Sequence, residues 1–531
     1  MRREDRERAQ IEAATRVVDR IVARAKTSDE LEEVLSDTLY WERQRLDRER
    51  KDKKRIKQDV AFYQELGRKL RHASEPDLRD YLDRVARRFA GEIVGSFDDR
   101  VYRMSTTAVP AILSVMLRAT TPDRLRSLSG MRRGLSDHVE VQGAVDRVKR
   151  LGKLGTMIVV PTHSSHLDSL VLGYAVHLLG MPPLLYGAGL NLFENPIMSF
   201  FMNNLGAYRV DRKKKDALYK DVLKEYATVA LELGYDNLFF PGGTRSRSGV
   251  VEQHLKRGLL GTGVQAFVNN LRAGRDKPNL YVAPCTISYK LVLEAETLIE
   301  DYLKEVGKSR YIIEDDEFSR PRRVLEFMKE LVSLDARVVV TFAEPLDLFG
   351  NPVDDAGQSL DPRGRVVDPK SYVMVDGEPK HDRQRDAEYT NELSREIAAA
   401  FLRHNVAMST HVVGLAASRL LTRKNPDVDR YRLLRTGGIS PCFSLSEISG
   451  EIDHLVKTLA ELPSGPRLGP EIAGQPADGI LEDALKAYGC YHLHPALQRR
   501  GDRIFHEDRN LLLYYGNRLR GYDLGRALGA N

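Results

Sequence analysis

Short apolar runs alternate with stretches of helical periodicity between about residues 139 and 342, and this alternation constrains the fold most. The apolar runs are residues 156–160, 183–186, 237–240, 281–287 and 337–342. The helical patterns among them include residues 168–179, 214–233 and 322–334. Strands that alternate with helices predict an α/β fold with a mixed, largely parallel sheet. Because the runs are mostly apolar, we expect helices to flank the sheet and cover both of its faces.

The same patterns divide the chain into four predicted regions. Residues 1–130 show helical periodicity, and residues 131–350 hold the α/β pattern expected of a catalytic domain. Residues 351–385 are rich in Asp, Gly and Pro, which predicts a loop or small excursion. Helical periodicity returns in residues 386–531. A chain of 531 residues is long enough for several such units.

Charge and cysteine content narrow the class of protein. The net charge of +6 is compatible with nucleic acid, an anionic membrane surface or phosphorylated small molecules as partners. Basic residues outnumber acidic ones nine to four between Trp41 and Gln58, which predicts either a lipid-binding helix or a solvated helix face. The cysteines show no metal-binding or disulfide spacing, which favours reduced thiols in the cytoplasm; they are Cys285, Cys442 and Cys490.

The N-terminus lacks the apolar core of a signal peptide, and no run of about 20 apolar residues exists that could span a bilayer. Any contact with a membrane is therefore expected to be peripheral.

The segment VPTHSSHLD, residues 160–168, is the first candidate site. An apolar strand is expected to end at Val160, which places His163 in the turn at its carboxyl end, where α/β folds usually hold their sites. Asp168 would lie in the first turn of the next helix and could accept the imidazole N–H. The free nitrogen could then remove a proton from a substrate alcohol, a step worth about 10²–10⁴-fold. A metal site that includes His166 and a purely structural role for both histidines stay open.

The loop LFFPGGTRSRSG, residues 238–249, is the second candidate. Its glycines expose backbone N–H groups, its arginines offer forked donors, and its hydroxyls add more donors, all of which suit a phosphate. The residues concerned are Gly242, Gly243, Thr244, Arg245, Ser246 and Arg247. An ordinary turn with solvated arginines is the alternative.

Two further segments are weaker candidates. Residues 205–220 place Arg209, Arg212 and Lys213 before a helix, which suits an anionic ligand or a helix entrance in water. The apolar strand VAPCTISY, residues 282–289, suggests no chemistry by itself, and Cys285 has no base near it in sequence to make it a nucleophile.

Taken in chain order, the four segments resemble the sequence blocks of the glycerol-3-phosphate and lysophosphatidate acyltransferase superfamily, especially its glycerol-3-phosphate branch. The family's histidine and aspartate, separated by four residues, match His163 and Asp168. Its third block usually carries a glutamate just before the glycine, where this chain has Gly242. The other matches are Gly206, Ala207, Tyr208 and Arg212 in the second block, Gly243, Arg245, Ser246 and Arg247 in the third, and Pro284 in the fourth.

The resemblance implies transfer of a fatty acyl group from acyl-CoA or acyl carrier protein to the sn-1 hydroxyl of glycerol 3-phosphate, in phospholipid synthesis. His163 and Asp168 would be catalytic. The acceptor phosphate would be held by Arg212, Lys213, Arg245, Ser246 and Arg247. The loop at Gly242, Gly243 and Thr244 would offer donors to the oxyanion.

The same resemblance predicts no cofactor and no metal. The reduced cysteines and the lack of a signal peptide or spanning run predict a cytoplasmic protein that associates peripherally with the inner face of an anionic membrane. Because the sequence has no RNP-like aromatic strand or zinc finger, no binding to nucleic acid is expected. Two alternatives remain. One is 1-acylglycerol-3-phosphate or dihydroxyacetone phosphate as the acceptor, and the other is a non-catalytic basic protein that binds membrane or nucleic acid.

Overall fold

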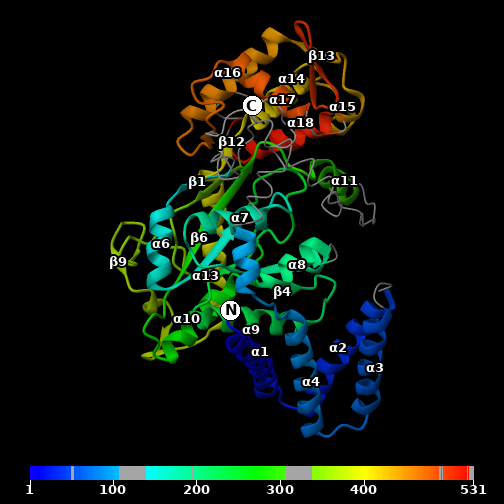
Figure 1. Cartoon of the computed structure of the whole chain (residues 1–531), viewed down its shortest axis with the longest axis vertical. Coiled ribbons are helices and arrows are strands. Elements are labelled where there is room, and N and C mark those ends of the chain that lie inside the picture. The colour runs from blue at the N-terminus through cyan, green and yellow to red at the C-terminus, as the bar shows by residue number, and fades with distance from the viewer. Residues whose placement is uncertain are drawn as a thin grey trace.

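The computed structural model describes residues 1–48, 53–106, 139–193, 196–306, 338–489, 492, 494–522 and 524. Figure 1 shows three parts along the longest axis of the molecule. The N-terminal helices lie at one end, an α/β region lies in the middle, and the C-terminal helices lie at the other end.

A seven-stranded sheet forms the centre of the α/β region, in the order β1-β7-β6-β2-β5-β3-β4. Neighbouring strands are parallel except for β6 and β7, which pair antiparallel. This confirms the predicted mixed, largely parallel sheet. The strands are β1 (Val139–Gly143), β2 (Thr156–Pro161), β3 (Leu185–Gly189), β4 (Ala207–Val210), β5 (Asn237–Leu238), β6 (Leu280–Tyr289) and β7 (Val338–Phe342).

Helices cover both faces of this sheet, as the alternation of β2 side chains makes plain. Met157 and Val159 join one hydrophobic core, whereas Ile158 and Val160 join another, because successive strand residues point to opposite faces. The first core includes residues of α6 and α7, and the second includes residues of α10 and α13. The helices of this region are α6 (Val145–Leu154), α7 (Asp168–Leu178), α8 (Pro196–Asn204), α9 (Ala217–Glu232), α10 (Gly261–Arg272), α11 (Ala295–Val306) and α13 (Arg383–Arg403).

The N-terminal helices share a core with α9 of the α/β region, so they are not a free-standing bundle. Buried residues of α1 and α4 pack with Leu218, Tyr219 and Val222 of α9. Arg16 forms an ion pair with Glu232 across this interface at 2.7 Å. The helices are α1 (Arg3–Arg24), α2 (Ser28–Arg48), α3 (Lys53–Leu70) and α4 (Glu75–Ile93).

Four helices and a small sheet make up most of the C-terminal part. The helices are α14 (Ser409–Arg423), α16 (Leu445–Glu461), α17 (Ala477–Tyr488) and α18 (Arg509–Gly516), followed by the short helix η7 (Asn517–Leu519). Helical periodicity did not predict the antiparallel sheet of β13 (Cys442–Ser444), β16 (Arg503–His506) and β15 (Leu497–Arg500). This part shares a core with β6 and α7, so its helices pack directly on the α/β region.

The four-region division of the chain stays a prediction. Within the excursion predicted at 351–385, short strands form two hairpins: β8 (Ser359–Leu360) pairs with β9 (Val366–Val367), and β10 (Met374–Val375) pairs with β11 (Glu378–Pro379). The helix predicted at 322–334 and part of the basic stretch at 41–58 lie outside the described residues. In the described part of the chain, no helix combines the length and apolar character needed to cross a membrane.

Candidate active site

The turn between β2 and α7 carries the predicted base and its carboxylate. β2 ends at Pro161, and the Thr162 N–H donates to the Cys285 carbonyl of β6 at 2.9 Å, which anchors the turn to the sheet. α7 begins at Asp168, so the carboxylate lies at the helix N-terminus and folds back toward the turn. His163 Nδ1 lies 2.7 Å from Asp168 Oδ2. The structure therefore places these two side chains in the predicted contact, and their catalytic role remains a prediction.

Asp168 is fully buried and accepts hydrogen bonds on both oxygens. Besides His163, the backbone N–H groups of Ser164 and Ser165 donate to Oδ2, at 2.7 and 3.0 Å. The Tyr289 hydroxyl, at the end of β6, donates to Oδ1 at 2.7 Å. Four donors converge on one carboxylate, which suits its charged form and fixes its orientation.

His163 is held as a neutral base. Burial lowers the pKa of His163 below its usual 6.5, although the Asp168 carboxylate opposes that shift. The Phe240 ring stacks on the imidazole, with ring centroids 4.1 Å apart. Because Nδ1 is engaged by Asp168, Nε2 is the nitrogen that can take a proton from a substrate.

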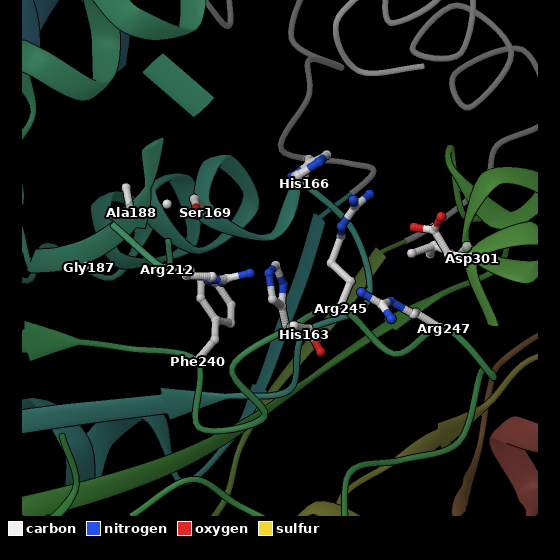
Figure 2. Close-up of a pocket in the computed structure, with 13 residues that line it drawn as sticks. His163, His166, Ser169, Gly187, Ala188, Arg212, Phe240, Arg245, Arg247 and Asp301 are labelled. Atoms are coloured by element: carbon white, nitrogen blue, oxygen red, sulfur yellow. The ribbon is translucent and has the colours of Figure 1, made fainter. Parts of the chain in front are cut away.

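A pocket of about 100 Å³ lies in front of the imidazole. Figure 2 shows His163 between Phe240 and Arg245, with Arg212 on the Phe240 side and Arg247 beyond Arg245. The lining comes from the β2–α7 turn and the start of α7, the end of β3, the segment between β4 and α9, the loop after β5 and helix α11. The residues are His163, His166, Ser169, Gly187, Ala188, Gly189, Arg212, Phe240, Thr244, Arg245, Arg247, Leu298 and Asp301.

Three of the predicted phosphate ligands line this pocket, and two do not. Arg212, Arg245 and Arg247 bring three guanidinium groups together. Arg212 is solvent-exposed as a whole residue, but partial enclosure of its guanidinium lowers the pKa of Arg212, and the charges of the other two arginines lower it further. Arginine so perturbed stays protonated at neutral pH. Lys213 and Ser246 lie outside the lining.

The loop after β5 is closed by its own backbone contacts. Gly243 has a φ of +75°, which favours glycine, and its N–H donates to the Phe240 carbonyl at 3.0 Å. That N–H is already engaged, whereas Thr244 is exposed at the pocket. The Ser246 hydroxyl donates to the Val250 carbonyl at 2.7 Å, so it braces the loop. The oxyanion role of Gly242, Gly243 and Thr244 remains a prediction.

A second buried carboxylate joins the turn to the arginines. Glu294 is fully buried; its Oε2 accepts from the Ser165 hydroxyl at 2.8 Å, and its Oε1 accepts from the His166 N–H at 2.7 Å. Arg245 Nη1 lies 3.2 Å from the same Oε1. Glu294 therefore holds Arg245 at the pocket and the β2–α7 turn in place.

The C-terminal part supports the site from behind. Arg518 of η7, which is almost fully buried, donates to the Ser164 hydroxyl at 3.3 Å and to the Ile287 carbonyl at 2.9 Å. Asn517 donates to the Ser248 carbonyl at 2.8 Å. These contacts join the last helices to both predicted loops.

Sequence reasoning missed Tyr289, Glu294 and Arg518, and also Glu252, whose Oε1 accepts from the His163 N–H at 2.7 Å. Only Tyr289 lay in a segment that had been singled out, as the last residue of VAPCTISY. Cys285 lies in the same strand, fully buried, and burial raises the pKa of its thiol well above its usual range. This agrees with the expectation that it is not a nucleophile.

Residues 138–288 match the family model described as Acyltransferase. The chain is similar to the glycerol-3-phosphate acyltransferase of Actinobacillus succinogenes, with 34% identity over 226 residues, which are 42% of this chain and 26% of that protein. It is 35% identical to that of Aeromonas hydrophila subsp. hydrophila over 218 residues, 41% of this chain and 24% of that protein. The matched region therefore spans about a quarter of the length of these curated relatives.

Among solved structures, the 1-acyl-sn-glycerophosphate (LPA) acyltransferase PlsC from Thermotoga maritima aligns with 56% of this chain and 92% of its own. The identity is 16% and the TM-score is 0.26.

Proposed function

We propose that the chain, whose residues 138–288 match the Acyltransferase family model, belongs to the glycerolipid acyltransferase family in its glycerol-3-phosphate branch. It transfers a fatty acyl group from acyl-CoA or acyl carrier protein to the sn-1 hydroxyl of glycerol 3-phosphate. The observation that carries this proposal is the meeting, in one pocket, of a neutral histidine oriented by a buried aspartate with three guanidinium groups.

His163 Nε2 removes the proton from the acceptor hydroxyl as its oxygen attacks the thioester carbonyl. The tetrahedral intermediate collapses, the C–S bond breaks and an ester C–O bond remains. The proton on His163 passes to the departing thiolate, so the base is regenerated and no acyl-enzyme forms. Asp168 stabilises the imidazolium that exists between these two proton transfers.

The arginines set the position of the acceptor. A phosphate bound by Arg212, Arg245 and Arg247 would hold the rest of a small acceptor against His163, and such placement supplies much of the rate. Asp301 lines the same pocket, and its carboxylate can accept hydrogen bonds from hydroxyl groups but repels phosphate. A cationic pocket with one carboxylate in its lining suits a phosphorylated polyol, and this favours glycerol 3-phosphate over an acylated acceptor.

Acyl transfer by the purified chain tests the proposal. Acyl-CoA and acyl carrier protein are supplied separately, each with glycerol 3-phosphate, dihydroxyacetone phosphate or 1-acylglycerol 3-phosphate. We expect the highest kcat/KM with glycerol 3-phosphate and a large loss in His163→Ala. A preference for another acceptor would correct the substrate. Failure of the wild type to acylate any acceptor would refute the enzymatic proposal and favour a non-catalytic binding protein.

We also propose that the protein works at the periphery of an anionic membrane in the cytoplasm. Helices that border the pocket carry exposed apolar side chains, among them Leu178 of α7 and Leu303 of α11, which are 44% and 38% exposed. Flotation with anionic vesicles should recover the protein with the lipid, and Leu178→Ser with Leu303→Ser should weaken that recovery. Equal recovery of the variant would argue against this surface, and binding to nucleic acid in place of vesicles would argue against the membrane.

A further inference from the structure

The loop that carries the arginines holds the main chain of His163 from both sides. The His163 N–H donates to Glu252 Oε1 at 2.7 Å. The His163 carbonyl accepts from the Ser246 N–H at 2.8 Å. Both partners belong to the segment that also contains Arg245 and Arg247. The position of the imidazole relative to the guanidinium groups therefore depends on these two hydrogen bonds.

The Glu252 carboxyl fills the space beside Gly242. A Cβ atom added at Gly242 would lie 3.1 Å from Glu252 Cγ and 3.2 Å from Glu252 Oε1. The second separation is one that Cβ and Oε1 of a single glutamate can adopt. A side chain at 242 would thus have to enter the volume that Glu252 already occupies. Gly242 is also the position at which the resembled family usually carries a glutamate.

The buried Glu252 carboxyl lowers the stability of the folded protein. Glu252 Oε2 is out of contact with solvent and has no hydrogen-bond partner among the described residues. Burial raises the pKa of Glu252 to about 7; Arg518 opposes that rise, and the charge of Asp168 adds to it. A buried oxygen without a partner destabilises the folded protein, and such groups are found mainly where function needs them.

We propose that Glu252 is a positioning residue for His163, and that it supplies from ten residues later the carboxylate that Gly242 lacks. It fixes the main chain of the base to the arginine loop, so that a bound phosphate and Nε2 keep a constant separation. The catalytic consequence rests on the proposed function, whereas the contact between Glu252 and His163 does not.

Removal of the carboxylate gives the first measurement. Glu252→Ala should lower kcat by about 10–100-fold, because small displacements of a reacting group cost about that much. The acceptor KM should change less than about threefold, since the arginines remain. Glu252→Gln keeps an acceptor oxygen for the His163 N–H and should retain more of the rate. An unchanged kcat in a folded Glu252→Ala protein would overturn the proposal.

A transplant of the carboxylate gives the sharper measurement. Gly242 does not have a positive φ, and once the Glu252 side chain is gone the atom nearest to its Cβ would be the Thr244 carbonyl oxygen, at 3.5 Å, an ordinary van der Waals contact. We expect Gly242→Glu combined with Glu252→Ala to recover most of the lost kcat. The matched control is Gly242→Leu with Glu252→Ala, which adds similar bulk without an acceptor and should recover nothing. Equal rates in the two double variants would refute the proposal.

A spectroscopic readout separates this inference from the proposed function. The downfield proton resonance of His163 Nδ1–H, assigned by its loss in His163→Ala, should shift in Glu252→Ala and return in the Gly242→Glu transplant. If the wild type transfers no acyl group, the proposed function fails, and the resonance alone decides the inference. A resonance that stays unchanged in all variants would overturn it. If Glu252→Ala does not fold, Glu252→Met, which keeps the bulk of the side chain but offers no carboxylate oxygen to the His163 N–H, takes its place in the kcat and resonance measurements.

Discussion

The two walls of the pocket are built on opposite electrostatic principles. On the His163 wall, the buried charge of Asp168 is met by four hydrogen-bond donors before any substrate arrives. On the other wall, Arg212, Arg245 and Arg247 bring three positive charges into one small volume, with Glu294 beside Arg245. The His163 wall has its hydrogen-bond partners already in the free protein, whereas the arginine wall is stabilised most when a phosphate binds. Changes in the first wall should therefore lower kcat, and changes in the second should raise KM.

The largest expected effect is at the base. His163→Ala should lower kcat by about 10³-fold or more, because general-base catalysis contributes about 10²–10⁴-fold. His166→Ala is the matched control: His166 lines the same pocket, but its contact with Glu294 uses the backbone N–H, which the substitution leaves in place. Steady-state kinetics on both folded variants compares them. Comparable losses in the two would show that the base is misassigned.

Substitutions in the arginine wall should change the acceptor KM and leave kcat nearly unchanged. Arg247→Ala should raise the acceptor KM by about 10–100-fold, since a hydrogen bond to a charged group is worth about 1.5–3 kcal/mol, and should change kcat less than about threefold. Lys213→Ala removes a nearby positive charge outside the lining and should have little effect. Initial rates over a range of acceptor concentrations separate the two parameters. If kcat falls while KM stays constant, this wall acts on the transition state instead.

The Glu252 carboxyl should make stability depend on pH. Because the pKa of Glu252 in the folded protein is raised to about 7, from 4.5, its stabilising contribution is present below pH 4.5 and is lost as the pH rises through about 7. Glu252→Gln cannot titrate, so the free energy of unfolding of the wild type, relative to this variant, should fall by about 1–3 kcal/mol between pH 4.5 and pH 8. Urea unfolding at both pH values measures the difference, and parallel pH dependence of the two proteins would contradict it.

The smallest expected effect comes from the loss of a single hydrogen-bond donor to Asp168. Tyr289→Phe removes one of the four donors to Asp168, and the other three remain. We expect kcat to fall about fivefold, which corresponds to about 1 kcal/mol, with the acceptor KM unchanged. Tyr281→Phe in the same strand is the control, because its hydroxyl contacts the Gly357 carbonyl at 3.4 Å, away from the site. Equal kinetics of the two variants would show that the Tyr289 donor is dispensable.

The elements on either side of His163 were predicted most accurately, because local periodicity determines them. The expected strand at 156–160 and helix at 168–179 are found as β2 (Thr156–Pro161) and α7 (Asp168–Leu178), and their junction brings His163 to Asp168. The strand expected at 237–240 is shorter, since β5 spans Asn237–Leu238. Phe240 leaves the ladder because its ring stacks on His163, and a tertiary contact of this kind leaves no mark on apolar periodicity.

What the sequence could not predict are contacts between distant segments. Glu252 lies in the polar stretch VVEQHLK, where nothing in composition distinguishes it from a solvated glutamate. Arg518 reaches Ser164 from a different part of the fold. Lys213, next to Arg212, was expected to share its role, but only Arg212 lines the pocket.

The contact between Arg518 and Ser164 has a consequence for biosynthesis. The two residues are separated by 354 positions, so at a translation rate of about 5–20 residues per second the ribosome needs roughly 20–70 s to supply the support after the turn has been made. Until then, the nascent chain holds the base and the arginine loop without the residue that braces them from behind. Activity should therefore begin no sooner than that interval after the turn has been made, and ribosome-bound chains that stop before η7 should be inactive.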